Sequence, residues 1–171
     1  MTAGEKAPDT ITDPVDWAKH YWEQQNLDGD EQRFLTVMSL LRFQRIVADI
    51  MENELKKQNL NVTDYLLLMT LQLSETGTRL ISSLARNLLV HATTATLATD
   101  RLEKRKLLKR SPHPTDRRAT CITITDLGRE TANEATRALS AVDFGLPGSS
   151  PSEVSKLNSA VRALRRSAGD T

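Results

Sequence analysis

The spacing of the apolar residues changes near residue 105. Before that point they recur every three or four residues, whereas segments 107–110 and 119–125 are short, apolar and partly β-branched. Such segments favour strands, and the eight residues between them, SPHPTDRR, supply turn formers and two prolines that stiffen the loop. The pattern therefore predicts a β-hairpin with a long loop, with Arg117 and Arg118 at its tip.

The remaining patterns are helical. Ser150-Pro151-Ser152-Glu153 has the form of a capping box, and Thr125 can cap the helix that follows the hairpin. The expected helices are residues 14–25 with Asp13 as N-cap, 31–58, 64–73 with Thr63 as N-cap, 82–88, 92–105, 126–142 and a last helix from Pro151. The low content of glycine, proline and aromatic residues agrees with a mainly helical protein. This order predicts a mainly α fold with a small β-wing, in which a winged helix-turn-helix core is flanked by N- and C-terminal helices, the candidates for dimerisation.

The net charge of +1 conceals two oppositely charged regions. Residues 1–31 carry eight acidic and two basic side chains, a net charge of −6, whereas residues 101–118 carry eight basic and two acidic ones, a net charge of +6. The total charge thus argues neither for nor against a nucleic-acid partner, but its distribution defines one acidic end and one basic patch.

Several classes of protein are not expected from this sequence. The longest apolar run, Tyr65–Met69, is too short to cross a bilayer, and the start of the chain lacks the apolar core of a signal peptide. We therefore expect a cytoplasmic protein without a membrane partner. The single cysteine, Cys121, cannot form an internal disulfide, and in a half-buried strand it is expected to be an inert apolar residue and not a redox sensor.

The sequence also gives no sign of catalysis. His20, His91 and His113 do not have the spacing of metal ligands, and there is no glycine-rich phosphate loop and no nucleophile motif. We expect no enzymatic activity, no metal and no cofactor.

The segment Leu84–Glu130 resembles the winged-helix core of the multiple antibiotic resistance regulator (MarR) family. The resemblance rests on Leu84-Ala85, Thr94-Ala95-Thr96, Asp100-Arg101-Leu102-Glu103, Asp116-Arg117-Arg118-Ala119 and Leu127-Gly128. It extends more weakly over residues 31–166. The resemblance implies a sequence-specific regulator of transcription, commonly a repressor, that binds a pseudo-palindromic operator in double-stranded DNA as a homodimer.

The second helix of the helix-turn-helix is the expected reader of bases. Its first two turns can place short polar side chains against base edges in the major groove, and threonine methyl groups can pack on thymine methyls. The alternative is that these residues are simply the exposed start of a helix. The candidates are His91, Ala92, Thr93, Thr94, Thr96, Leu97 and Arg101.

The wing supplies a second set of candidate contacts. Asp116 can accept hydrogen bonds from loop amides or pair with an arginine, and in either way it would aim the tip. The resemblance implies that Arg118 enters the minor groove, whose negative potential is enhanced where it is narrow, and that Arg117 contacts the adjacent phosphates. A solvated basic loop is the alternative. Further phosphate-contact candidates are Ser82, Arg86, Lys104, Lys109 and Arg110, although cations at a helix end also complement the helix dipole.

The chain departs from the family pattern at three places. Lys106 stands where the family usually has glycine, so the turn after the recognition helix is expected to close without a left-handed glycine. His113-Pro114 stands where the wing usually begins Asp-Pro, and Leu97 occupies a position often held by arginine. The operator sequence therefore cannot be copied from relatives.

A two-fold dimer is expected, because one such module buries little surface and reads only one half-site. The candidate interface residues are Leu139, Val142, Val154, Leu157, Val161 and Leu164. A monomer that buries these apolar stripes internally is the alternative. The expected division is a disordered N-terminus (1–12), N-terminal dimerisation helices (13–58), a winged helix-turn-helix domain (59–125), C-terminal dimerisation helices (126–167) and a tail (168–171).

The resemblance also implies a small aromatic or phenolic effector, often anionic, that binds between the dimerisation helices and the winged domain. The candidate ligand residues are Trp17, Tyr21, Arg42, Phe43 and Arg45. A plain core role for the aromatic residues is the alternative. The main rival to a DNA-binding function is a winged helix that contacts only proteins.

Overall fold

The computed structural model describes residues 11–116 and 118–170. The chain forms two compact units, one before Ala48 and one from Ala48 onward. Arg117 and most of the segment predicted to be disordered at the N-terminus lie outside the described residues.

The first unit contains helix α1 (Pro14–Gln25) and the first part of helix α2 (Glu31–Lys56), whose remainder belongs to the second unit. Asp13 caps α1 as predicted, because its carboxylate accepts hydrogen bonds from the backbone amides of Val15 and Asp16. Asn26, in the left-handed conformation, ends the helix. The rings of Trp22 and Phe34 lie 4.9 Å apart and join the two helices of this unit.

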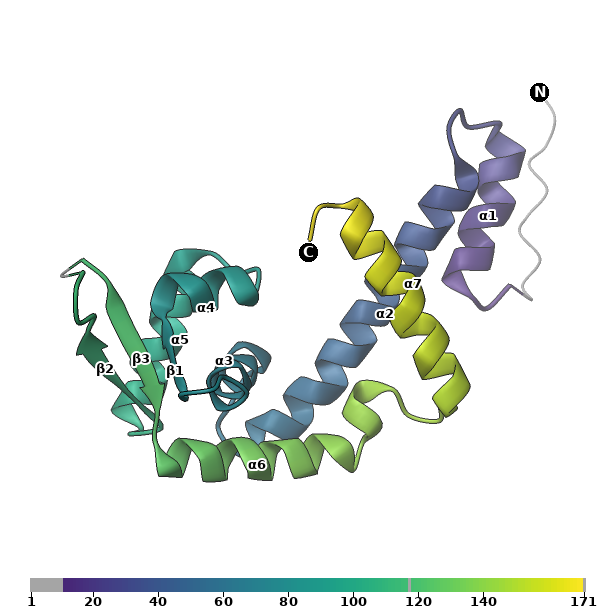
Figure 1. Cartoon of the computed structure of the whole chain (residues 1–171). Helices are drawn as coiled ribbons and strands as arrows, with labels where there is room; N and C mark the ends of the chain where they lie inside the picture. The colour runs from purple at the N-terminus through teal and green to yellow at the C-terminus, as the bar shows by residue number, and fades with distance from the viewer. Residues whose placement is uncertain (1–10, 117, 171) are drawn as a thin grey trace. The chain divides into compact units, whose positions relative to one another are not determined.

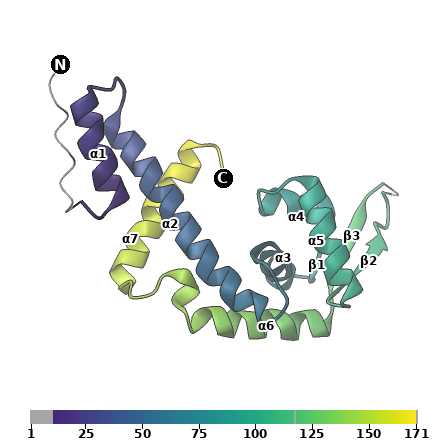
Figure 2. The ribbon, with the colours of Figure 1, turned by 180° about the vertical axis from the view of Figure 1, so that it is seen from behind.

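The second unit is built around a three-stranded antiparallel sheet with the order β1-β3-β2 (Figure 1). Its elements are α3 (Val62–Gln72), β1 (Thr78–Leu80), α4 (Ile81–Asn87), α5 (Ala92–Lys104), β2 (Leu108–Pro112) and β3 (Thr120–Ile124). Helices α3 and α4 contact β3, and α5 contacts β2. Figure 2 shows the β2–β3 hairpin from behind, with its tip at the end of the strands distant from α6 (Asp126–Ser140).

One apolar core holds the second unit together. It joins the end of α2 to helices α3 to α6 and to the sheet. Its largest fully buried apolar side chains are Leu55, Leu67, Leu68, Leu71, Leu84, Leu102, Leu108, Ile122 and Leu139. Burying an apolar side chain of this size contributes about 1.5–3 kcal/mol, so this core positions the helix-turn-helix against the wing.

The predicted fold class is confirmed, with two local differences. Helix α3 is capped by Asn61 and not by Thr63, because Asn61 and Asp64 form a reciprocal capping box. Strand β1 was not predicted, since three residues are too few to show a period. It pairs with β3, and the side chains of Thr78 and Thr123 are joined by a hydrogen bond of 2.8 Å.

After the wing, the chain continues through α6, a short 3-10 turn at Asp143–Gly145, labelled η1, and α7 (Pro151–Ser167). Thr125 caps α6 as predicted by accepting a hydrogen bond from the amide of Gly128. Ser150 and Glu153 form the predicted capping box of α7. None of the described helices is both long enough and apolar enough to span a membrane.

Leu139 requires a correction, because it was predicted to lie in a dimer interface. It is fully buried in the core of its own chain, where α6 also contributes Ala132 and Ala135. The apolar stripe of α6 is therefore already covered, and Leu139 is not available to a partner. The stripe of α7 differs, since Val154 and Leu164 are exposed and Leu157 and Val161 are only half-buried.

Candidate nucleic-acid interface

The start of α5 is held by a turn and a cap. Leu89 takes the left-handed conformation between α4 and α5, and His91 is the N-cap residue. The Nδ1 atom of His91 accepts a hydrogen bond from the amide of Thr93 and lies 3.0 Å from the Thr93 hydroxyl. His91 therefore fixes the start of α5, and its contacts with the amide and the hydroxyl of Thr93 orient that residue.

Helix α5 has one buried and one open face. Ala95, Ala98, Thr99 and Leu102 are buried against the core. The buried Thr99 hydroxyl donates to the backbone oxygen of Ala95 at 2.7 Å, so its polar group is satisfied. The open face carries the candidate base readers, all exposed: His91, Ala92, Thr93, Thr94, Thr96 and Leu97.

A surface hollow brings predicted residues from two helices together. Ser82 and Arg86, predicted to contact phosphates, line it with His91 and Ala92 at the start of α5. The hollow is completed by Ala85, Leu89 and Val90, which the sequence argument did not select. For Leu89 and Val90 the signal that could have identified them is their position in the turn, because this turn lies beside the start of a recognition helix, whereas Ala85 lies within α4 and carried no such signal.

Hydrogen bonds within the wing tip order its backbone. The carboxylate of Asp116 accepts from the amide of Arg118 at 2.9 Å, as the predicted aiming role requires, and the carbonyl of Asp116 accepts from Ala119. The Nδ1 atom of His113 accepts from the amide of Asp116 at 3.2 Å. Arg118 is exposed. Arg117, which was predicted to contact the adjacent phosphates, lies outside the described residues.

The base of the wing closes through Lys106. This turn has no glycine, as expected, but Lys106 itself adopts the left-handed conformation, with φ 62°. Its carbonyl accepts a hydrogen bond of 2.8 Å from the Thr125 hydroxyl, which ties the start of the hairpin to its end. This contact helps to hold a lysine in a conformation that ordinarily favours glycine.

Arg110 differs from the other phosphate-contact candidates because it is already paired. Its guanidinium contacts the carboxylates of Asp100, at 2.5 Å, and Glu103, at 3.4 Å. About a third of its side chain is exposed. Arg110 therefore joins β2 to α5, whereas Lys104, Lys109 and Arg86 are exposed and available to a polyanion.

Arg101 also has a partner within the chain. Its Nη2 atom lies 2.7 Å from the Oδ1 atom of Asp64, a buried carboxylate at the start of α3. Arg105, one turn further on, donates to the carbonyl oxygens of Gln58 and Asn59. Both arginines fix α5 against its neighbours. In the described part of the chain, no group of three or more metal-ligating side chains is brought together.

The candidate ligand residues separate into two groups. Trp17 and Tyr21 line a cavity in the first unit, together with other side chains of α1 and the start of α2. Arg42, Phe43 and Arg45 do not line it. The two arginines are exposed on α2, and Phe43 is half-buried.

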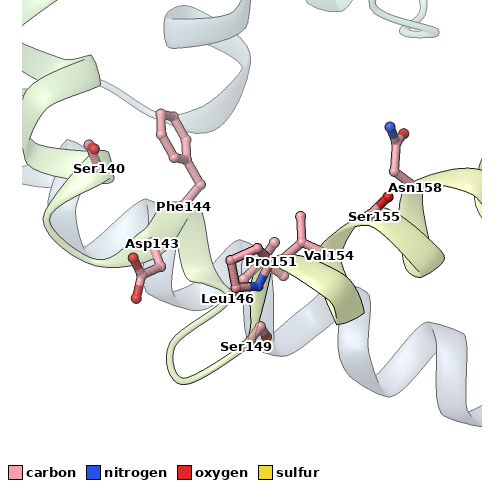
Figure 3. Close-up of a pocket in the computed structure, with 9 residues that line it drawn as sticks. All are labelled: Ser140, Asp143, Phe144, Leu146, Ser149, Pro151, Val154, Ser155 and Asn158. Carbon is pink, nitrogen blue, oxygen red and sulfur yellow. The ribbon is translucent and has the colours of Figure 1, made fainter.

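A second hollow lies where the η1 turn leads into α7. Val154, one of the predicted interface residues, sits there beside Leu146 and Pro151, with Phe144 further along the wall (Figure 3). Phe144 and Val154 each keep 38% of their surface exposed. This region thus presents apolar side chains that no described part of the chain covers.

Comparison with known proteins places this arrangement in one family. The model of the MarR family matches residues 60–120, which contain the helix-turn-helix and most of the wing. An uncharacterized helix-turn-helix transcriptional regulator of Bacillus subtilis, YhbI, is 30% identical over 116 residues, or 68% of this chain and 72% of that protein.

Solved structures agree with this assignment. Sco5413, a MarR family transcriptional regulator of Streptomyces coelicolor, has a TM-score of 0.76 and 34% identity, over 81% of this chain and 96% of that one. BpsR of Bordetella bronchiseptica, whose DNA binding is regulated by 6-hydroxynicotinic acid, has a TM-score of 0.65 and 26% identity, over 75% and 98% of the two chains. These relatives are regulators and not enzymes. The resemblance seen in the sequence is confirmed, and the chain belongs to the MarR family of transcriptional regulators.

Proposed function

We propose that the protein binds double-stranded DNA in a sequence-specific manner, with α5 in the major groove and the β2–β3 wing in the adjacent minor groove. The observation that carries this proposal is the division of α5 into two faces. The face that includes Ala95 and Leu102 is buried, whereas Thr93, Thr94 and Thr96 are open to a partner. A helix anchored in this way can present short side chains to base edges without losing its position.

The charges around α5 support the same proposal. Arg86, Lys104 and Lys109 are exposed basic side chains on α4, α5 and β2. Arg118 stands at the wing tip on a backbone that Asp116 orders. Cations in these positions neutralise phosphates, and an arginine on a wing can enter a narrow minor groove. Arg101 and Arg110 are assigned instead to positioning α5 and the wing, since each is held by a carboxylate of the chain.

We propose further that the functional unit is a homodimer. Helix α7 carries an apolar stripe that includes Val154, Leu157, Val161 and Leu164, and Leu164 is 60% exposed. A helix with an exposed apolar stripe of this length needs a partner to bury it. Two copies related by a two-fold axis would read half-sites about one helical turn apart, which requires a pseudo-palindromic operator.

The regulatory part of the proposal is repression relieved by a small aromatic effector. BpsR, whose DNA binding responds to an aromatic acid, supports an effector of this kind for this chain. An effector that binds the DNA-free conformation more tightly than the DNA-bound one lowers the affinity of the protein for its operator. At saturation, the factor is the ratio of the effector's affinities for these two conformations.

The test is selection of a randomised duplex library by the purified protein near physiological salt. We expect an inverted repeat with half-sites about one turn apart. A Thr94→Ala variant should shift the selected bases, whereas Lys109→Ala should weaken binding to all sequences and lower the salt dependence by about one unit of slope. Retention without any motif would contradict sequence-specific binding, and no retention at all would favour a module that contacts only proteins.

A further inference from the structure

The first unit contains a cavity of about 330 Å³ whose wall is mainly aromatic. Its volume lies within the range of small-molecule sites. It is formed entirely by α1, the following turn and the first turn of α2. The lining residues are Trp17, Ala18, Tyr21, Trp22, Gln25, Leu27 and Phe34.

The aromatic rings form two contacting pairs along this wall. The centroids of Trp17 and Tyr21 lie 4.8 Å apart, and those of Trp22 and Phe34 lie 4.9 Å apart. Trp17 remains 51% exposed and Phe34 41% exposed, so the cavity can be reached from solvent in this chain. The wall offers ring faces, apolar groups and the Gln25 amide, but no charged side chain that could pair with an anion.

The segment that forms the cavity carries an excess of acidic side chains. Residues 11–34 carry six acidic and only two basic side chains. One of the two bases, Arg33, is paired with Asp30, with its Nε atom 3.1 Å from a carboxylate oxygen. Lys19 is the other base of this segment, and two further bases of the first unit, Arg42 and Arg45, lie further along α2 and do not line the cavity. This excess of acidic side chains favours a cation over an anion as the ligand of the cavity.

We propose that this cavity binds a small organic cation with aromatic or alkyl groups, of the quaternary ammonium type. The faces of tryptophan, tyrosine and phenylalanine attract such cations, and recognition of quaternary ammonium groups by several rings is a recurrent use of this interaction. Binding of the cation does not depend on the proposed function. Only its role as an effector of DNA binding rests on that function. The inference replaces the expected anionic effector with a cationic one at this cavity.

The two tryptophans of the chain, Trp17 and Trp22, both line the cavity, so intrinsic fluorescence reports on it directly. The full-length protein is titrated at constant ionic strength with benzyltrimethylammonium, benzyl alcohol and benzoate. We expect a saturable fluorescence change with the cation, binding at least several-fold weaker for the neutral alcohol, and none for benzoate. Added salt should weaken binding of the cation, since exposed carboxylates contribute to it.

Two matched variants test the assignment to this wall. Phe34→Leu should weaken binding of the cation about two- to five-fold, whereas Phe43→Leu, the same change outside the lining, should leave it unchanged. If Phe34→Leu loses helicity by circular dichroism, the double variant Glu23→Gln and Asp28→Asn is used in its place. This double variant should weaken binding of the cation more than binding of the alcohol.

Three results would overturn the proposal: no saturable response to the cation, equal affinity for cation and alcohol, or tighter binding of benzoate. Acrylamide quenching of the free protein is a further test, because tryptophans shielded by a second copy of the chain would show that the cavity is an interface.

Operator affinity is measured separately with and without the cation. If the cation binds but operator affinity is unchanged, the site stands and its effector role fails. If no operator exists, the binding result is unaffected.

Discussion

Asp64 at the start of α3 and Arg101 in the middle of α5 form an ion pair of 2.7 Å that joins the recognition helix to the core. The Asp64 side chain is only 6% exposed, whereas that of Arg101 is 48% exposed. The same carboxylate accepts from the amide of Asn61 in the capping box of α3. One buried acid therefore fixes both the start of α3 and the position of α5.

Replacing Arg101 with methionine should destabilise the protein by about 1–3 kcal/mol, because it leaves a buried carboxylate without its charged partner. The exposure of Arg101 places the expected value toward the lower end of this range. Urea unfolding followed by circular dichroism measures the change. Lys104→Met, which removes an exposed charge of the same helix, should change stability by less than about 0.5 kcal/mol. Equal effects of the two variants would contradict a positioning role for Arg101.

Arg118→Ala and Arg110→Ala should affect different properties. Arg118 is exposed at the wing tip, so its loss should weaken binding to a selected operator without lowering the stability of the protein. Arg110 is held by Asp100 and Glu103, so its loss should lower stability by up to about 1 kcal/mol. Fluorescence anisotropy with labelled duplex gives the affinity, and thermal unfolding gives the stability. A stable Arg118→Ala protein with unchanged affinity would exclude Arg118 from DNA binding.

Gly128→Ala should destabilise the junction between the wing and α6. A Cβ atom at this position would overlap the backbone oxygen of Leu107 and lie 2.9 Å from the Cγ1 atom of Ile124. The Leu107 oxygen cannot move freely, since it accepts the amide of Thr125 at 3.1 Å. We expect a loss of about 1–3 kcal/mol. Glu134→Ala, on the exposed face of the same helix, is the control and should change stability by less than about 0.5 kcal/mol.

The capping box of α7 should give the helix a pH dependence. Hydrogen bonds from the Ser150 side chain and backbone lower the pKa of Glu153 below its ordinary value. For an acid whose pKa is lowered by folding, the stabilisation is complete above the unfolded pKa, about 4.3, and is lost as the pH falls through the folded value. NMR titration should therefore show a depressed Glu153 pKa that rises toward normal in Ser150→Ala. An unchanged pKa in that variant would contradict the capping box.

Leu164→Glu should convert the proposed homodimer to monomer, because Leu164 is 60% exposed on the apolar stripe of α7. Sedimentation velocity measures the change in mass. Ser159→Glu introduces the same charge at another exposed position of the helix and should leave the dimer intact. A Leu164→Glu protein that sediments like the unchanged chain would remove α7 from the interface.

Local patterns in the sequence predicted the order of the helices and of the β2–β3 hairpin, and the character of the candidate site, but not strand β1. The change of period near residue 105 located the wing, and the caps at Asp13, Thr125 and Ser150 set helix starts, because these signals depend on residues close together in the chain. The Asp-Arg-Arg segment after a helix-turn-helix was likewise visible without a structure. The family followed from these local features.

Which of the candidate side chains have partners within the chain became clear only from the folded structure. Leu139 and Val154 both belong to apolar helical stripes, but the first is buried in its own core and the second is exposed. Arg110 and Lys109 are neighbours in β2, yet only Arg110 lies beside two carboxylates of α5. Burial and ion pairing depend on contacts between residues far apart in the chain, and periodicity does not encode those contacts.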